Sequence, residues 1–227
     1  MRIIIIGSRG RLGSVLSSMF TSAGHIVVGI DISNAGILDQ EIRGADIAIL
    51  TVPIAESIGL LKKYAPACPI IETSSVKRPF KEFRNVVISI HPLFGPLSVD
   101  EEGMNNIAFI RDISPAGSID IVRSLFPDFN IISMTAEDHD QLAIQLQVIP
   151  YIISILSSRL MTDTDVSTRS RNALSSLARV SGAQNGEVLK DTIRLNPYSK
   201  SAFTRILEVL NEIGGEYIDS CPTQQAS

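Results

Sequence analysis

Residues 3–13 read Ile-Ile-Ile-Ile-Gly-Ser-Arg-Gly-Arg-Leu-Gly, and this stretch decides the fold class. Four isoleucines without polar alternation are typical of a short strand that is buried on both faces of a parallel sheet. Three glycines, Gly7, Gly10 and Gly13, follow at once, and a helical segment begins at Arg11. A strand, a glycine-rich turn and a helix in this order are characteristic of a unit that binds the pyrophosphate of a dinucleotide.

The residues after this loop strengthen the interpretation. Asp31 ends the second predicted strand, close to the spacing of about 20 residues at which a carboxylate binds a ribose 2′-hydroxyl. Such a carboxylate repels a 2′-phosphate, so NAD is favoured over NADP, although Arg9 and Arg11 are cations in the same loop. Serine stands in the first position of the G-x-G-x-x-G register, at Ser8. A tight strand–helix turn without a dinucleotide is the alternative. The loop residues predicted to bind the cofactor are Gly7, Ser8, Gly10, Arg11, Leu12 and Gly13, together with Asp31.

The pattern of strands and helices continues to about residue 134. Seven short segments rich in Ile and Val predict strands: Ile3–Ile6, Ile26–Asp31, Asp46–Val52, Pro69–Glu72, Val86–Ile90, Ile107–Arg111 and Asn130–Ser133. Between them, helices are predicted over Arg11–Ala23, Ala55–Tyr64 and Pro115–Phe126, the last with Ser114 as its N-cap. This alternation predicts an α/β fold with a Rossmann-type, doubly wound and mainly parallel sheet in a domain of residues 1–134.

A small all-helical domain is expected over residues 135–227. Thr135 to Asp138 form a capping box that opens a long helix, which Pro150 should kink. Apolar residues cover more than one face of this helix, so we expect a partner to bury it, as in a homodimer formed through the helical domain. Further helices are predicted over Arg169–Ala183, Glu187–Leu195 and Ser199–Ile213.

Composition excludes several classes of protein. The 227 residues carry a net charge of −4 and a pI near 5.4, so neither nucleic acid nor an anionic membrane is an expected partner. No uninterrupted apolar run approaches the length of a membrane-spanning helix, about 20 residues. The N-terminal residues do not have the pattern of a signal peptide. The two cysteines, Cys68 and Cys221, form no metal-ligand pair, so no metal site is predicted. We expect a cytoplasmic protein that acts on a small molecule.

Three histidines are available as a general base. His91 follows a buried strand at its carboxyl end, where ligands of open α/β sheets bind, and its ordinary pKa of about 6.5 suits proton transfer near neutral pH. Ser75 and Lys77 follow the preceding strand at the same edge. A loop histidine without a catalytic role, a solvated cluster at Arg78, Lys81 and Arg84, and a helix-end role for His139 are the structural alternatives.

Read in order, the motifs resemble the prephenate dehydrogenase family. They are the glycine loop, Val52-Pro53, Ser75-Val76-Lys77, His91-Pro92-Leu93-Phe94-Gly95-Pro96 and Glu137-Asp138-His139-Asp140-Gln141. The histidine–proline motif is similar to the form fused to chorismate mutase in enteric bacteria, although no mutase segment is seen ahead of the first strand. The likeness extends to about Asn196, and it adds Val52 and Pro53 to the expected cofactor site.

This resemblance implies NAD-dependent oxidative decarboxylation of prephenate to 4-hydroxyphenylpyruvate, a step of tyrosine biosynthesis. It implies that His91 takes the proton of the substrate's ring hydroxyl while Ser75 orients that contact, which makes these two the catalytic residues. It also implies that Arg179 binds the ring carboxylate. His139, Gln147 and Tyr151 complete the expected substrate site.

Two departures keep alternatives open. Tyr151 stands where the family usually has a second substrate-facing histidine, and Ser8 replaces a loop glycine. An arogenate dehydrogenase would use the same residues on the amino analogue of the substrate. A reductase of imines or small hydroxy acids on the same fold, and an NAD-binding sensor or scaffold without activity, are further alternatives.

Overall fold

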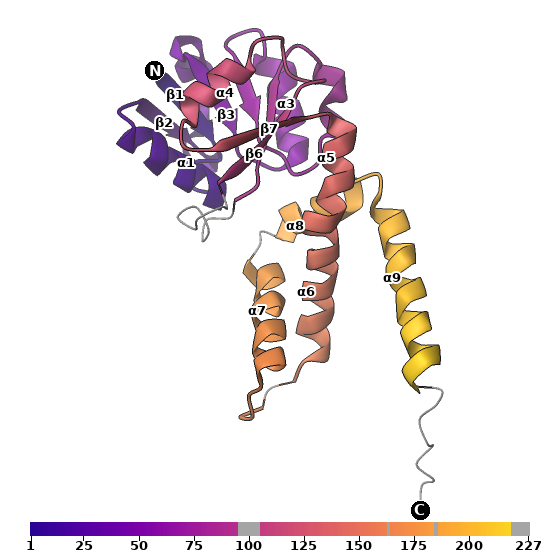
Figure 1. The fold of residues 1–227 in the computed structure, drawn as a ribbon. Coiled ribbons are helices and arrows are strands. Elements are labelled where there is room, and N and C mark those ends of the chain that lie inside the picture. Colours follow the sequence, from indigo (N-terminus) through magenta and orange to yellow (C-terminus); the bar gives the residue numbers. More distant parts are fainter. Residues whose placement is uncertain (95–104, 163, 184–185, 219–227) are drawn as a thin grey trace, which may run out of the picture.

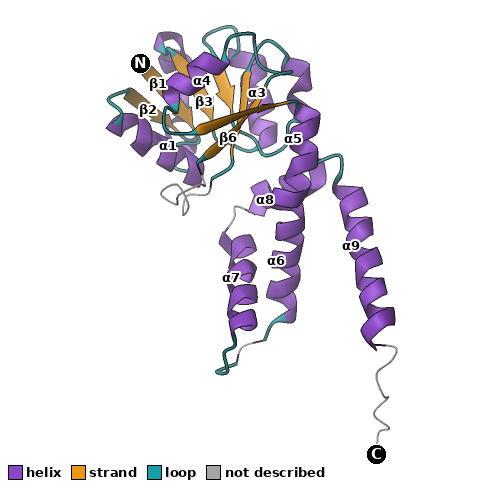
Figure 2. Cartoon of the chain, viewed as in Figure 1, coloured by secondary structure: helices purple, strands orange, loops and turns teal. Residues whose placement is uncertain are grey.

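The computed structural model describes residues 1–94, 105–162, 164–183 and 186–218 (Figure 1). It consists of a seven-stranded sheet covered by helices, followed by helices that extend away from the sheet (Figures 1 and 2). The predicted fold class and all seven predicted strands are confirmed. The strands are β1 (Arg2–Ile6), β2 (Ile26–Ile30), β3 (Ile47–Leu50), β4 (Ile70–Glu72), β5 (Ile88–Pro92), β6 (Asn106–Ile110) and β7 (Asn130–Met134).

The strand order across the sheet is β2-β1-β3-β4-β5-β6-β7. Strands β1 to β5 are mutually parallel, whereas β6 is antiparallel to β5 and parallel to β7. The chain runs from β1 to β2 at one edge and then returns to β3 on the other side of β1. This change of direction leaves a crevice outside the carboxyl ends of β1 and β3, where ligands of doubly wound sheets bind.

Alternate residues of β1 serve two cores, one on each face of the sheet. Ile3 and Ile5 pack with α1 (Arg11–Ser22) and α4 (Ile119–Leu125) on one face. Ile4 and Ile6 pack on the other face with α2 (Leu38–Glu41), α3 (Ile54–Tyr64) and the short 3₁₀ helix η3 (Arg78–Phe83). Both faces of β1 are therefore buried, which explains its uniformly apolar sequence.

The predicted start of α4 is wrong. The helix begins at Ile119 rather than Pro115, because Gly117 adopts a φ of 77° and interrupts the helical conformation. Ser114 does not cap the helix; its hydroxyl accepts a hydrogen bond from the Ser89 N–H at 2.9 Å. The short helices η1 (Ile32–Ile37), α2, η2 (Ile42–Gly44) and η3 were not among the predicted elements.

The long helix after β7 begins as predicted. Thr135 Oγ1 accepts from the Asp138 N–H at 3.1 Å, and Asp138 accepts in return from the Thr135 N–H at 3.2 Å. The helix comprises α5 (Ala136–Ala143), a π-helical turn η4 (Ile144–Val148) and α6 (Ile149–Leu160). The irregularity expected at Pro150 thus takes the form of a widened turn immediately before the proline.

Three further helices match the prediction within one residue. They are α7 (Arg169–Ala183), α8 (Gly186–Leu195) and α9 (Ser199–Ile213), and a π turn, η5 (Gly214–Ile218), follows α9. Ile144, Val148 and Ile152 form a small buried cluster with side chains of α8 and α9. Along α9, by contrast, several large apolar side chains are about half exposed: Phe203, Leu207, Leu210 and Ile213.

The stretch Ala136–Leu160 also corrects an expectation. Its 25 residues are long and apolar enough to cross a membrane by length and composition, although uninterrupted apolar runs gave no such segment. The buried central helix of a soluble protein passes the same test, and the first part of this helix packs against the sheet (Figure 1). Length and composition alone therefore do not assign this helix to a membrane.

Candidate active site

A cavity of about 670 Å³ opens at the carboxyl ends of the parallel strands. Its walls come from the glycine loop and from the segments that follow β3, β4 and β5. The helical part closes it with residues of η4, α6 and α8. The residues that line it include Arg9, Gly10, Arg11, Leu12, Val52, Pro53, Ser75, His91, Gln147, Tyr151, Val188 and Asp191. The α/β part and the helices thus build one site together.

The glycine loop is shaped by close backbone approach. Gly7 has a φ of 90°, and a Cβ there would lie 2.6 Å from the Thr51 carbonyl oxygen. A Cβ on Gly13 would lie only 2.2 Å from the carbonyl oxygen of Gly7. Side chains are therefore excluded at both positions, and the loop stays tight where α1 begins. This geometry fits a pyrophosphate held by backbone N–H groups at the helix N-terminus.

The other predicted cofactor residues lie in this loop or next to it. Gly10 is the N-cap of α1 and provides no side-chain hydrogen bond to the first turn, while Arg11 and Leu12 line the cavity with Val52 and Pro53. Ser8 takes part in the loop, where its N–H donates to the Ile30 carbonyl at 3.1 Å, but it does not line the cavity.

Asp31 lies directly after β2, as predicted, and it organises the loop. Its carboxylate accepts from the Arg9 N–H at 2.9 Å and from the Ile32 N–H at 2.8 Å. These backbone hydrogen bonds, that from Arg9 foremost, lower the pKa of Asp31 and keep it ionised. A fixed negative charge thus stands beside the glycine loop, at the expected place for a ribose.

His91 is the histidine that faces the cavity. It belongs to β5, is buried, and lies with its Nε2 3.4 Å from the side-chain Nε2 of Gln147. Burial, His139 and Lys77 hold the pKa of His91 well below its usual range, so the ring is neutral near pH 7. A neutral imidazole can accept a proton, as a general base must. The end of the histidine–proline motif, Gly95-Pro96, lies outside the described residues.

Ser75 shares this cavity but has a partner that was not predicted. Its hydroxyl lies 2.7 Å from Thr192 Oγ1, and the Thr192 hydroxyl lies 2.8 Å from the Val188 carbonyl. When Thr192 donates to that carbonyl, Ser75 donates to Thr192 and keeps its lone pairs for a further donor. The contact links the end of β4 to α8 across 117 positions of the chain.

His139 differs from its predicted role. It is buried on α5, its Nε2 lies 2.9 Å from His91 Nδ1, and its Nδ1 lies 2.9 Å from Asp140 Oδ1. It does not line the main cavity. Both ring nitrogens of His139 thus contact protein groups, those of His91 and Asp140.

Lys77 is fully buried, whereas its neighbours Arg78, Lys81 and Arg84 are exposed. Its Nζ donates to Glu72 Oε1 at 2.7 Å and to the Ile90 carbonyl at 2.6 Å. Glu72, also fully buried, accepts in addition from the Ser74 N–H at 2.8 Å and from the Ser89 hydroxyl. Burial lowers the pKa of Lys77, although Glu72 opposes that effect. This ion pair ties β4 to β5 directly behind His91.

Gln147 and Tyr151 line the cavity from the helical side, where they were predicted. Gln147 belongs to the π turn, and its buried side-chain oxygen has no hydrogen-bond partner in the described structure. Tyr151 is buried on α6, and burial raises the pKa of its phenol, so it remains a donor. A ligand with a hydroxyl and a carboxylate would therefore meet an acceptor and a donor here.

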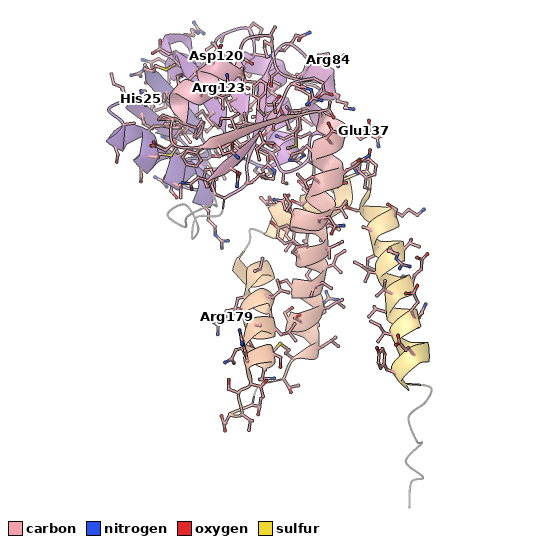
Figure 3. The ribbon with its side chains drawn as sticks, viewed as in Figure 1. His25, Arg84, Asp120, Arg123, Glu137 and Arg179 are labelled. Atoms are coloured by element: carbon pink, nitrogen blue, oxygen red, sulfur yellow. The ribbon has the colours of Figure 1, made fainter. Side chains whose placement is uncertain are left out.

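Arg179 is not brought to this cavity. It is exposed on α7, and Figure 3 shows it on the side of that helix away from α6. His25 likewise lies far from the site, beside the N-terminal amine. Two residues of α8 that were not predicted also belong to the site: Asp191, which lines the cavity, and Thr192, which contacts Ser75. Val188, Asp191 and Thr192 share one helix face by their spacing, which is the signal that could have identified them. Among the described residues, no group of histidines, cysteines and carboxylates could hold a metal ion.

These features define a class of protein: a doubly wound α/β fold with a dinucleotide-type loop and a buried histidine at one cavity. No protein-family model matches the chain. A 103-residue segment is 29% identical to the T-protein of Haemophilus influenzae, and the match covers 41% of this chain and 27% of that relative. The chain thus matches about a quarter of the relative's length.

Solved structures make the likeness more particular. The chain superposes on Synechocystis arogenate dehydrogenase with a TM-score of 0.64 at 18% identity, covering 95% of this chain and 92% of that one. For prephenate dehydrogenase from A. aeolicus, in complex with hydroxyphenyl propionate and NAD⁺, the TM-score is 0.72 at 14% identity, with coverage of 95% and 90%. The resemblance to the prephenate dehydrogenase family is confirmed, and the fold is the one that these prephenate and arogenate dehydrogenases share.

Proposed function

We propose that this protein is a prephenate dehydrogenase that uses NAD. The observation that carries the proposal is the position of His91: it is buried and neutral, and its Nε2 faces the cavity onto which the glycine loop opens. A base and a hydride acceptor must both reach one carbinol for this chemistry. The resemblance in sequence and fold supports the same reaction.

The chain's own residues suit each step. NAD, when bound, supplies the hydride acceptor, and the tight loop at Gly7 and Gly13 would hold its pyrophosphate. His91 Nε2 accepts the proton of the ring hydroxyl as the hydride leaves the carbon that bears it. The bond to the ring carboxyl group then breaks, carbon dioxide departs, and its electron pair flows through the ring to the oxygen. That oxygen takes back a proton from His91, and aromaticity drives the step.

The choice of NAD over NADP follows from Asp31. Its ionised carboxylate stands at the ribose position and would repel a 2′-phosphate. Arg9 and Arg11 line the cavity and are the cations that would oppose this preference. Replacing Asp31 by asparagine should reduce the preference for NAD in kcat/KM at least about tenfold.

Arogenate is a second candidate substrate because of Asp191. This carboxylate lines the cavity, and its side chain is 18% exposed. Its nearest described cation, Arg194, is 3.3 Å away but 76% exposed, so the pair is weakened by solvent. A carboxylate at this place could bind the ammonium group that arogenate carries and prephenate lacks. Asp191→Asn should then lower kcat/KM for arogenate and leave that for prephenate unchanged.

We also propose a cytoplasmic homodimer formed through the helices. The half-exposed apolar side chains of α9 support it, because exposing such an apolar surface to water is unfavourable. The role of Arg179 in holding the ring carboxylate stays a prediction, because Arg179 lies outside the cavity within one chain.

Initial rates with purified protein test the function. Prephenate and arogenate are each supplied with NAD and with NADP, and reduced nicotinamide is followed by absorbance. Turnover of prephenate with NAD is the expected result. A preference for arogenate would show that arogenate is the substrate, and the proposed mechanism would stay the same. Bound NAD without turnover of either compound would instead support a sensor or scaffold.

A further inference from the structure

A row of three side chains leads from the interior to the cavity. Asp140 Oδ1 lies 2.9 Å from His139 Nδ1, and His139 Nε2 lies 2.9 Å from His91 Nδ1. All three side chains are buried, and the two rings meet edge to face at 5.1 Å between centroids. The far end of the row, His91 Nε2, faces the cavity.

The direction of the hydrogen bonds along this row is fixed at Asp140. Its two oxygens accept from the backbone N–H groups of Lys77, at 2.8 Å, and Arg78, at 3.0 Å. A carboxylate that already accepts two N–H groups acts as an acceptor only. The Nδ1 of His139 must therefore carry the proton that it shares with Asp140.

The proton positions on both rings follow. A neutral His139 with its proton on Nδ1 presents a lone pair at Nε2, so His91 Nδ1 must be the donor between the two rings. The lone pair of His91 then lies on Nε2, towards the cavity. The amide nitrogen of Gln147, a donor, lies 3.4 Å from this atom, which agrees with an acceptor there.

We propose that Asp140 and His139 are positioning residues that set the tautomer of His91, so that a lone pair and not an N–H faces the substrate. The catalytic part of this inference rests on the proposed function, whereas the tautomers themselves do not. Without the row, His91 would present an N–H to the hydroxyl whose proton it must take. When His91 gains that proton, its Nδ1–H remains donated to His139, and the Asp140 carboxylate offsets the new charge.

Other charged groups bear on the same rings. Lys77 from the segment after β4 lowers the pKa of both histidines, while Glu72 and Asp140 act in the opposite sense on His139. The Lys77–Glu72 pair is fully buried and lies behind the row, so the variants below leave it intact.

Imidazole nitrogen NMR tests the tautomers without any substrate. The chain has three histidines, and His25→Gln and His139→Gln assign the spectrum. We expect His91 and His139 to carry their protons on Nδ1 at pH 7.5. In His139→Leu, which removes the acceptor, His91 should shift towards the Nε2–H form. A His91 that is protonated on Nε2 in the wild type, or that does not change in His139→Leu, overturns the inference.

Kinetics test the consequence. His139→Leu should lower kcat about 10²- to 10⁴-fold, the range for a base held in the wrong tautomer, and leave the dissociation constant of NAD unchanged. His139→Gln, whose amide oxygen can still accept from His91 Nδ1, should recover activity to within about tenfold of the wild type. His25→Gln is the matched control and should change neither quantity. Equal loss of kcat in His139→Leu and His139→Gln would contradict the positioning role.

The two tests separate the possible failures. If the wild type turns over neither prephenate nor arogenate, the proposed function is wrong. The NMR spectrum then still shows, independently of activity, whether Asp140 and His139 set the tautomer of His91. If His139→Leu does not fold, the wild-type spectrum still tests the tautomer of His91, and the activity of His139→Gln still tests the positioning role.

Discussion

The α/β part and the helical part of this protein differ in how completely they bury their apolar side chains. In the α/β part, strands such as β1 and β3 bury almost every side chain on both faces within one chain. In the helical part, three buried residues of the central helix form the small core, while α9 keeps a row of half-exposed apolar side chains. The α/β part thus buries its apolar side chains within one chain, whereas the helical part leaves an apolar surface exposed on α9. The candidate active-site cavity lies where the two parts meet.

The largest effect is expected from breaking the buried ion pair of the α/β part. Lys77→Met leaves Glu72 buried without its cation, and such a loss costs about 3–5 kcal/mol of unfolding free energy. The double variant Lys77→Met/Glu72→Gln, which has no buried charge at this place, should regain part of the lost unfolding free energy. Denaturant unfolding measures both, with Lys63→Met, at the exposed pair with Asp39, as the control that should change little. A Lys77→Met protein as stable as the wild type would contradict the role of the pair.

The glycine loop should be nearly as sensitive. A Cβ at Gly13 would meet the Gly7 carbonyl at 2.2 Å, so Gly13→Ala should cost about 1–3 kcal/mol and abolish measurable NAD binding in calorimetry. Gly59→Ala is the matched control. Gly59 lies within α3 with open space around it, so alanine there should stabilise the protein by about 0.5–1 kcal/mol. Unchanged NAD binding in Gly13→Ala would remove the loop from the cofactor site.

The helical part should respond through association rather than folding. Leu207→Glu places a charge in the apolar row of α9 and should raise the dimer dissociation constant about 30-fold or more, about 2 kcal/mol. Sedimentation velocity over a range of concentrations measures it. Thr204→Glu, one turn away on the same helix and also exposed, adds the same charge beside the row and should have a smaller effect. A wild type that stays monomeric at all concentrations would contradict the homodimer.

A smaller effect is expected from pH. Burial lowers the pKa of His91 and His139 in the folded state, whereas the unfolded chain titrates near 6.5. Below that pH the unfolded state binds more protons, so the free energy of unfolding falls, by up to about 1.4 kcal/mol per pH unit for each histidine. Unfolding at pH 7.5 and 5.5 should show a smaller fall in His91→Gln than in the wild type. An equal fall in His91→Gln and in the wild type would refute the assignment.

Elements that a local sequence pattern specifies were predicted well in both parts of the molecule. The apolar strands and the capping box at Thr135 were predictable because local pattern alone specifies them. The start of α4 was not, since the conformation of Gly117 overrides the helix signal at Pro115. In the candidate site, Asp31 and His91 were predicted from their positions at strand ends, and Gly13 from the spacing of the glycines at the start of α1.

The remaining site residues depend on contacts that sequence spacing does not reveal. Ser75 meets Thr192 only after the helices fold back onto the sheet, and Lys77 finds its buried partner across the end of β4. The position of His139 was not predictable, because its contact with His91 joins residues 48 positions apart in the chain. Arg179 was assigned by resemblance alone, and the fold of one chain leaves it outside the cavity.

The role of His91 as the general base is tested most directly by comparing His91→Asn with the wild type. NAD reduction is followed at saturating prephenate, and NAD affinity is measured separately. We predict that the wild type turns over, and that His91→Asn binds NAD with unchanged affinity but reduces it about 10²- to 10⁴-fold more slowly. A His91→Asn rate within about threefold of the wild type would show that His91 is not the base.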